Sequence, residues 1–101
     1  MARVGVIVEF RIKPGSWAAF DAHIRDHATR TLAEEEGCER FDVLQPLDEH
    51  GAKDESRILL CEVYRDQAAF DIHRKGPRMP GVGERSKPLL DGRTLSVCEM
   101  A

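Results

Sequence analysis

One short stretch, Glu62-Val-Tyr-Arg-Asp-Gln-Ala-Ala-Phe-Asp-Ile-His73, carries the chain from a strand into a helix. Alternating side chains from Ile58 to Tyr64 predict a strand over residues 58–64. One face of this strand holds Ile58, Leu60, Glu62 and Tyr64, and the other holds Leu59, Cys61 and Val63. Asp66 then offers a carboxylate to the free amides of a helix start, so we predict that it is the N-cap of a helix.

The helix that follows Asp66 carries a histidine on its apolar arc. At about 100° per residue, that arc is formed by Ala69, Phe70, Ile72 and His73. Glu62 and Tyr64 share one face of the strand before it. The stretch therefore brings a carboxylate, a phenol and an imidazole towards one apolar wall, and this combination is the best indication of function in the sequence.

The first third of the chain predicts a strand followed by a helix. Residues 3–12 alternate strictly, as in a half-buried strand. A Pro-Gly pair breaks the strand, and we expect Ser16 to cap a helix over residues 17–35. The stripe of that helix consists of Trp17, Phe20, Ile24, His27 and Thr31. We expect Gly37 to end the helix through its tolerance of positive φ.

The remaining segments complete a ferredoxin-like order. A second strand is predicted over about 39–45, and the polar segment 46–56 suits an exposed hairpin loop. Prolines and glycines predict an irregular segment over 77–88, with a single helical turn before the last strand at about 93–100. The order β-α-β-β-α-β predicts an α+β fold with an antiparallel four-stranded sheet.

The same pattern predicts a homodimer. Two helices cover only one face of a four-stranded sheet, whereas the strand over 58–64 is apolar on both faces. A strand that is buried on both sides needs a cover on each. Within this chain nothing else supplies the second cover, so we expect two copies to pack sheet on sheet.

Composition restricts the class of protein. A chain of 101 residues with 42% hydrophobic residues suits a single domain over 1–101. A net charge of −3, with scattered lysines and arginines, disfavours nucleic-acid binding, and no apolar run is long enough to span a membrane. The N-terminus has no signal-peptide pattern, and the three cysteines (Cys38, Cys61 and Cys98) suit small buried side chains in a reducing compartment. We therefore expect a cytoplasmic protein.

Each candidate residue also has a structural interpretation. His27 alone is more simply a core histidine, and Tyr64 could serve packing, whereas His73 has a second histidine and a phenol expected nearby. Glu62 must find a partner, because a lone buried carboxylate costs several kcal/mol, and a structural ion pair is as reasonable as catalysis. His23 and His27 have the i, i+4 spacing of a metal pair, but no third ligand accompanies them. We predict no metal site.

Four segments of the chain resemble the antibiotic biosynthesis monooxygenase family. They are Val-Glu-Phe-Arg-Ile-Lys-Pro-Gly15, Glu-Glu-Gly-Cys-Glu-Arg-Phe-Asp-Val-Leu-Gln45, Glu62-Val-Tyr-Arg-Asp66 and Ala69-Phe-Asp-Ile-His73. The resemblance implies a dimeric α+β barrel. It also implies one of three activities known in the family: cofactor-independent oxygenation of phenols and quinols, haem degradation, or isomerisation of the phosphorylated autoinducer-2 signal. The segments Arg-Phe-Asp-Val-Leu-Gln45 and Pro88-Leu-Leu-Asp-Gly-Arg-Thr94 are similar to that isomerase in particular.

Two departures from the family narrow these expectations. Many relatives have tryptophan where this chain has Tyr64, and the asparagine–tryptophan–histidine set of the haem-degrading members is not found. Several relatives also place a second histidine after a proline, where Pro77 is here followed by Arg78. A guanidinium is a poor proton shuttle but a good clamp for an anionic or phenolate oxygen.

These observations predict a cofactor-independent monooxygenase that oxidises a small phenolic, quinol or polycyclic aromatic substrate with dioxygen. Two alternatives remain open: an isomerase of a small phosphorylated hydroxy-ketone, and a non-catalytic ligand-binding dimer. For catalysis we assign His73 as the general base, oriented by Glu62. Tyr64 and Arg78 are expected to stabilise negative charge on a substrate oxygen, and His27 to contact the substrate.

Overall fold

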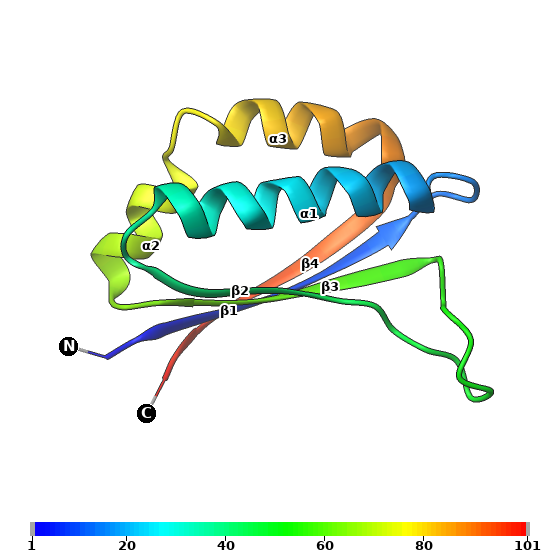
Figure 1. Cartoon of the computed structure of the whole chain (residues 1–101), viewed down its shortest axis with the longest axis horizontal. Coiled ribbons are helices and arrows are strands. Elements are labelled where there is room, and N and C mark those ends of the chain that lie inside the picture. Colours follow the sequence, from blue (N-terminus) through cyan, green and yellow to red (C-terminus); the bar gives the residue numbers. More distant parts are fainter. Residues whose placement is uncertain (1, 101) are drawn as a thin grey trace.

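Four antiparallel strands form one sheet in the order β2-β3-β1-β4, with the helices on one of its faces (Figure 1). The structure, a computed structural model, describes residues 2–100. Its elements are β1 (Val4–Ile12), α1 (Trp17–Glu34), β2 (Cys38–Leu44), β3 (Arg57–Tyr64), α2 (Gln67–Arg74), α3 (Met79–Ser86), the 3₁₀ turn η1 (Lys87–Leu89) and β4 (Leu90–Glu99). The predicted ferredoxin-like α+β fold is confirmed. In the described part of the chain, no helix combines the length and the apolar character needed to cross a membrane.

Strand alternation places the core on the helix-facing side of the sheet. Alternate residues of β1, beginning with Val4, are buried. Among them, Val6, Val8 and Phe10 each pair with a residue of β3 on one side and a residue of β4 on the other. On β3 the predicted face of Ile58, Leu60, Glu62 and Tyr64 is the buried one. The rings of Phe10 and Phe20 pack edge to face with centroids 4.8 Å apart, and this contact helps to hold α1 on the sheet.

Neither boundary of α1 is formed by the interaction that the sequence predicted. Ser16 occupies the N-cap position, but its side chain makes no capping hydrogen bond. The helix ends at Glu34, and Gly37 does not have positive φ. Glycine is needed at position 37 for space instead, because a methyl group there would lie 2.5 Å from Cβ of Ala69. The prediction of a helix-ending glycine was therefore wrong in its mechanism.

The start of α2 is as predicted, and its buried arc is narrower than predicted. Asp66 caps the helix by accepting a hydrogen bond from the Ala69 amide at 2.8 Å. Phe70 and His73 are buried, whereas Ile72 is 63% exposed and lies outside the core. This helix has only two turns and packs chiefly on the end of β3, where the Phe70 and Tyr64 rings lie 5.3 Å apart.

The segment expected to be irregular, 77–88, contains a third helix. Pro80 lies in the first turn of α3, where the missing amide hydrogen has no helical partner to lose. His23 of α1 fixes this helix through Nε2, which lies 3.1 Å from the Val82 carbonyl oxygen and 3.0 Å from Ser86 Oγ. Tertiary contact with α1 thus stabilises a glycine-containing segment that has weak helical propensity by itself. The last strand also begins earlier than expected, because Leu90 pairs with Ile12 beyond a bulge.

The opposite face of the sheet is partly apolar, and none of the helices in residues 2–100 covers it (Figure 1). Ile7 is 44% exposed and Leu44 is 48% exposed, while Leu59, Cys61 and Val63 are half-buried. We call these five residues the outer face. The expectation of buried cysteines holds only for Cys38, since Cys61 is half-buried and Cys98 is exposed, and all three are free thiols.

Candidate functional site

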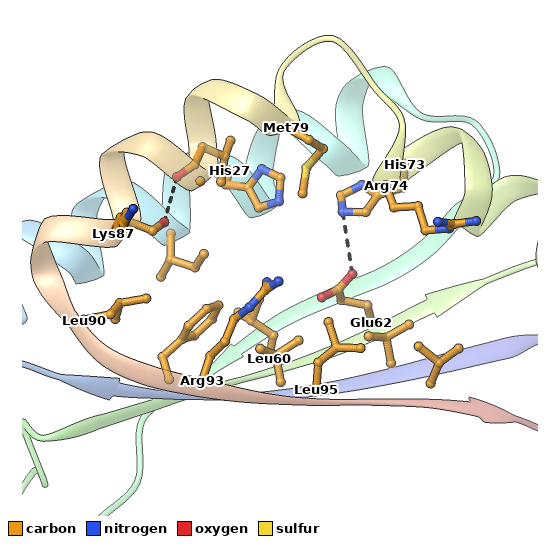
Figure 2. Close-up of a pocket in the computed structure, with 18 of the residues that line it drawn as sticks. His27, Leu60, Glu62, His73, Arg74, Met79, Lys87, Leu90, Arg93 and Leu95 are labelled. Carbon is orange, nitrogen blue, oxygen red and sulfur yellow. Dashed lines mark hydrogen bonds and ion pairs between the residues drawn. The ribbon is translucent and has the colours of Figure 1, made fainter.

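A cavity of about 860 Å³ lies between the helices and the sheet (Figure 2). Strands β1, β3 and β4 form its floor, and residues of α1, α2 and α3 line it from the opposite side. Most of the floor is apolar, namely Val6, Val8, Phe10, Leu60, Leu95 and Val97. At one end of the cavity Glu62 rises from the floor, and His27 and His73 approach from the helices.

His73 is held at this end by a carboxylate that the sequence did not single out. Its Nδ1 lies 3.0 and 3.1 Å from the two carboxylate oxygens of Glu35, beyond the end of α1. A carboxylate accepts hydrogen bonds, so Nδ1 carries the ring proton and Nε2 keeps its lone pair. Burial lowers the pKa of His73, although the Glu35 charge opposes this shift. The geometry therefore favours a neutral imidazole with a basic Nε2.

Glu62 lies next to that basic nitrogen but does not orient it. The distance from His73 Nε2 to Glu62 Oε1 is 3.9 Å, which is too long for a hydrogen bond. Glu62 is only 4% exposed and accepts a 2.6 Å hydrogen bond from the Tyr64 hydroxyl. Burial raises the pKa of Glu62 to about 7, in spite of that hydrogen bond. The carboxyl group can therefore take up or release a proton near neutral pH.

His27 has the opposite arrangement of its ring proton. Arg78 Nη1 lies 3.1 Å from His27 Nδ1, and because a guanidinium can only donate, Nδ1 must accept. Burial, together with the charges of His73 and Arg78, lowers the pKa of His27 to about 4. The ring is thus neutral with its proton on Nε2. The centroids of the two imidazoles lie 5.4 Å apart, so the site combines one acceptor and one donor nitrogen.

Tyr64 and Arg78 lie behind the residues that face the cavity. Tyr64 is fully buried, and its hydroxyl donates a hydrogen bond to Glu62. Burial, and to a lesser extent the Glu62 charge, raises the pKa of Tyr64. Arg78 bonds His27 and Thr31, and its Nη2 lies 3.6 Å from Glu35 Oε2. Neither side chain lines the cavity. The structure thus brings His27, Glu62 and His73 together at the cavity and places Tyr64 and Arg78 around them as partners.

Two further residues of the site were missed from the sequence, namely Glu35, which holds His73, and Arg93, which lines the cavity. Glu35 follows α1 in an acidic run, and nothing in the local pattern pairs it with a histidine 38 residues away. Arg93 lies on β4 and lines the floor. Its alternation with Leu95 and Val97 was visible in the sequence and could have placed it on that face.

The histidine pair at i, i+4 does not converge on a common point. His23 Nε2 is bonded to α3, whereas His27 Nδ1 is bonded to Arg78. Across residues 2–100, no group of three or more histidine, cysteine, aspartate or glutamate side chains is arranged to hold a metal ion.

Comparison with known proteins supports the resemblance found in the sequence. The family model for antibiotic biosynthesis monooxygenases matches residues 3–80. A search of curated proteins found no significant match.

Among solved structures, a candidate antibiotic biosynthesis monooxygenase from Caulobacter crescentus CB15 superposes with a TM-score of 0.88 at 20% identity, covering 99% of this chain and 91% of that one. A second candidate, from Nitrosomonas europaea, gives 0.85 at 21% identity, with coverage of 98% and 90%. A dimeric protein of unknown function and ferredoxin-like fold from Bacteroides fragilis gives 0.79 at 12% identity, with coverage of 99% and 98%. At these identities the superpositions establish the fold.

Proposed function

Since the chain belongs to the antibiotic biosynthesis monooxygenase family, we propose that it is a cofactor-independent monooxygenase that oxidises a small phenolic, quinol or polycyclic aromatic substrate with dioxygen. One observation carries the proposal. His73 has its Nδ1 on Glu35 and a basic Nε2 at a cavity with a mostly apolar floor. A neutral imidazole fixed in this way suits the removal of a phenolic proton.

The proposed reaction needs only the substrate and dioxygen. His73 Nε2 takes the phenolic proton, and the electron pair is delocalised onto a ring carbon that carries one hydrogen. That carbanion gives one electron to dioxygen, and the two radicals combine to form a carbon–oxygen bond, which yields a peroxide anion. The protonated His73 returns its proton to the terminal peroxide oxygen. The Glu62 carboxylate then takes the hydrogen of that carbon as a proton, and the O–O bond breaks to leave a carbonyl group and hydroxide. Hydroxide takes the proton held by Glu62 and leaves as water.

The neighbours of His73 support this sequence of steps. The Glu35 carboxylate stabilises the imidazolium that forms when His73 is protonated. The Nε2 proton of His27 is available to a phenolate oxygen as a donor fixed in position. Glu62, with its pKa raised to about 7 by burial, suits the second proton transfer. Tyr64 and Arg78 act through Glu62 and His27 in this scheme, because neither reaches the cavity.

Oxygen uptake by the purified protein tests the proposal, with anthrone and hydroquinone as substrates. We expect His73→Ala to reduce turnover by about 10²–10⁴, the usual loss for a general base, while the melting temperature stays close to that of the wild type. His50→Ala is the matched control, because His50 is exposed in the 46–56 loop. Unchanged turnover per folded molecule would remove His73 from the reaction.

A second candidate function is favoured by the closeness of two proton-transfer groups. His73 Nε2 and Glu62 Oε1 are 3.9 Å apart, an arrangement that suits moving a proton between adjacent carbons of a small phosphorylated hydroxy-ketone. An isomerase of this kind would exchange deuterium into a ketose without consuming oxygen. A non-catalytic ligand-binding dimer would do neither.

The proposal includes a homodimer formed through the outer face. Its half-exposed apolar side chains suit sheet-on-sheet packing, and one structural relative is described as dimeric. We expect sedimentation at micromolar concentration to give twice the chain mass of 11.4 kDa. Ile7→Glu should shift the protein towards monomer, and a wild-type monomer at that concentration would contradict the dimer.

A further inference from the structure

The floor of the cavity carries a positively charged side chain on β4. Arg93 lies on β4 directly opposite Phe10, on the helix-facing side of the sheet. Figure 2 shows its guanidinium rising from the floor into the cavity. Apart from Glu62, Asp91 and Arg93, the side chains of the floor are apolar. Arg93 is exposed, so its guanidinium is free to bind a ligand group that carries negative charge or hydrogen-bond acceptors.

The protein itself does not neutralise this end of the cavity. Among residues 2–100, neither Arg93 nor the nearby lining residue Lys87 takes part in an ion pair. Arg74, which lines the other end, differs because it pairs with Asp71 at 2.9 Å. Asp91 is the acidic residue beside Arg93 and Lys87, so two positive charges face one negative charge.

The strand register separates the two ends of the cavity. Glu62 lies opposite Val6 of β1, whereas Arg93 lies opposite Phe10. Four residues of strand correspond to about 13 Å at about 3.4 Å per residue. Among residues 2–100 no ion pair joins Glu62 and Arg93, and Val8 and Leu60 occupy the register position between them.

We propose that Arg93, assisted by Lys87, binds an anionic group of the substrate and so fixes its orientation. The ligand class is an elongated apolar molecule with a carboxylate or similar anion at one end and a phenolic group at the other. Its anionic group would bind the Arg93 guanidinium, its apolar part would pack on the floor, and its phenol would face His73. This inference rests on the proposed function for the phenolic end, and on the cavity alone for the anionic end.

Two fluorescent probes with one skeleton test the anion site. Anilinonaphthalene sulfonate carries an anion on an apolar aromatic body, and N-phenyl-naphthylamine is its neutral counterpart. We expect Arg93→Met to weaken sulfonate binding by about tenfold or more, as for the loss of a charge-assisted hydrogen bond. The affinity for the neutral probe should not change, and Arg93→Lys should keep part of the sulfonate affinity. Arg85→Met is the control, because this exposed α3 arginine does not line the cavity.

The inference is overturned if Arg93→Met leaves sulfonate binding unchanged, if it weakens both probes equally, or if Arg85→Met has the same effect. Thermal unfolding of each variant checks that the fold is kept. The assay needs no turnover, so its result is separate from that of the oxygen-uptake experiment. A selective loss of sulfonate binding without oxygenase activity would leave the anion site standing and remove the proposed reaction.

Discussion

Replacing Glu62 by glutamine should make the stability of the protein less dependent on pH. Glutamine keeps an acceptor for the Tyr64 hydroxyl and removes the titration. Burial raises the pKa of Glu62 from 4.5 to about 7. At about 1.36 kcal/mol per pKa unit, the ionised carboxylate then costs the folded state about 3 kcal/mol above pH 7.

The direction of the effect follows from where the proton is bound. Between pH 4.5 and about 7 the folded state keeps the proton on Glu62, whereas the unfolded chain has begun to release it. The stabilisation by the protonated form is complete below pH 4.5 and is lost as the pH rises through about 7. His27 contributes in the opposite direction, because burial lowers its pKa to about 4, but it is present in both proteins and cancels in the comparison.

Urea unfolding of wild type and Glu62→Gln at pH 5 and pH 8.5 measures this difference. We expect the variant to gain about 2–3 kcal/mol relative to wild type between these two pH values. All samples need one protein concentration, because dimer formation would otherwise change the apparent stability. Glu55→Gln, in the exposed 46–56 loop, should show no such gain. An equal stability difference at both pH values would mean that Glu62 is not a buried, proton-binding carboxyl group.

Two further substitutions test the geometry around the site. The Glu35 charge raises the pKa of His73, so Glu35→Gln should lower that pKa. The acid limb of the pH–turnover profile should then move to lower pH, and the maximum rate should fall. An acid limb that does not move would contradict the Glu35–His73 contact. Gly37→Ala should destabilise the protein by about 1–3 kcal/mol in urea unfolding, because the new methyl group would overlap Ala69. Adding Ala69→Gly should recover part of this loss, and a fully stable single variant would show that the approach of α2 is looser than described.

The separation of Glu62 from Arg93 within the cavity is a consequence of the sheet. Glu62 and Arg93 belong to strands on opposite sides of β1, and their register positions differ by four residues along it. A sheet holds such a separation rigidly, because each strand is fixed by its ladder of hydrogen bonds. The helical groups, His27 and His73, are then added to one end only.

The sequence alone determined the order of the strands and of helices α1 and α2, and the faces of the strands. Alternation between Ile58 and Tyr64 placed Glu62 and Tyr64 on the core side, and Asp66 marked the start of α2. These features depend on residues that are neighbours in the chain, where side-chain direction follows directly from the backbone period. For the same reason the arc of α2 predicted correctly that His73 is buried.

Only the tertiary structure decided which side chains meet. The Glu35–His73 contact joins residues 38 positions apart, and the Arg78–His27 contact joins residues 51 positions apart. Helix α3 likewise depends on His23, although its own prolines and glycines favour a loop. Local periodicity fixes the direction of a side chain along its own element. It does not fix the relative position of two elements that pack together. That relative position determines the partner of His73, the burial of Tyr64 behind Glu62, and the placement of Arg93 within the cavity.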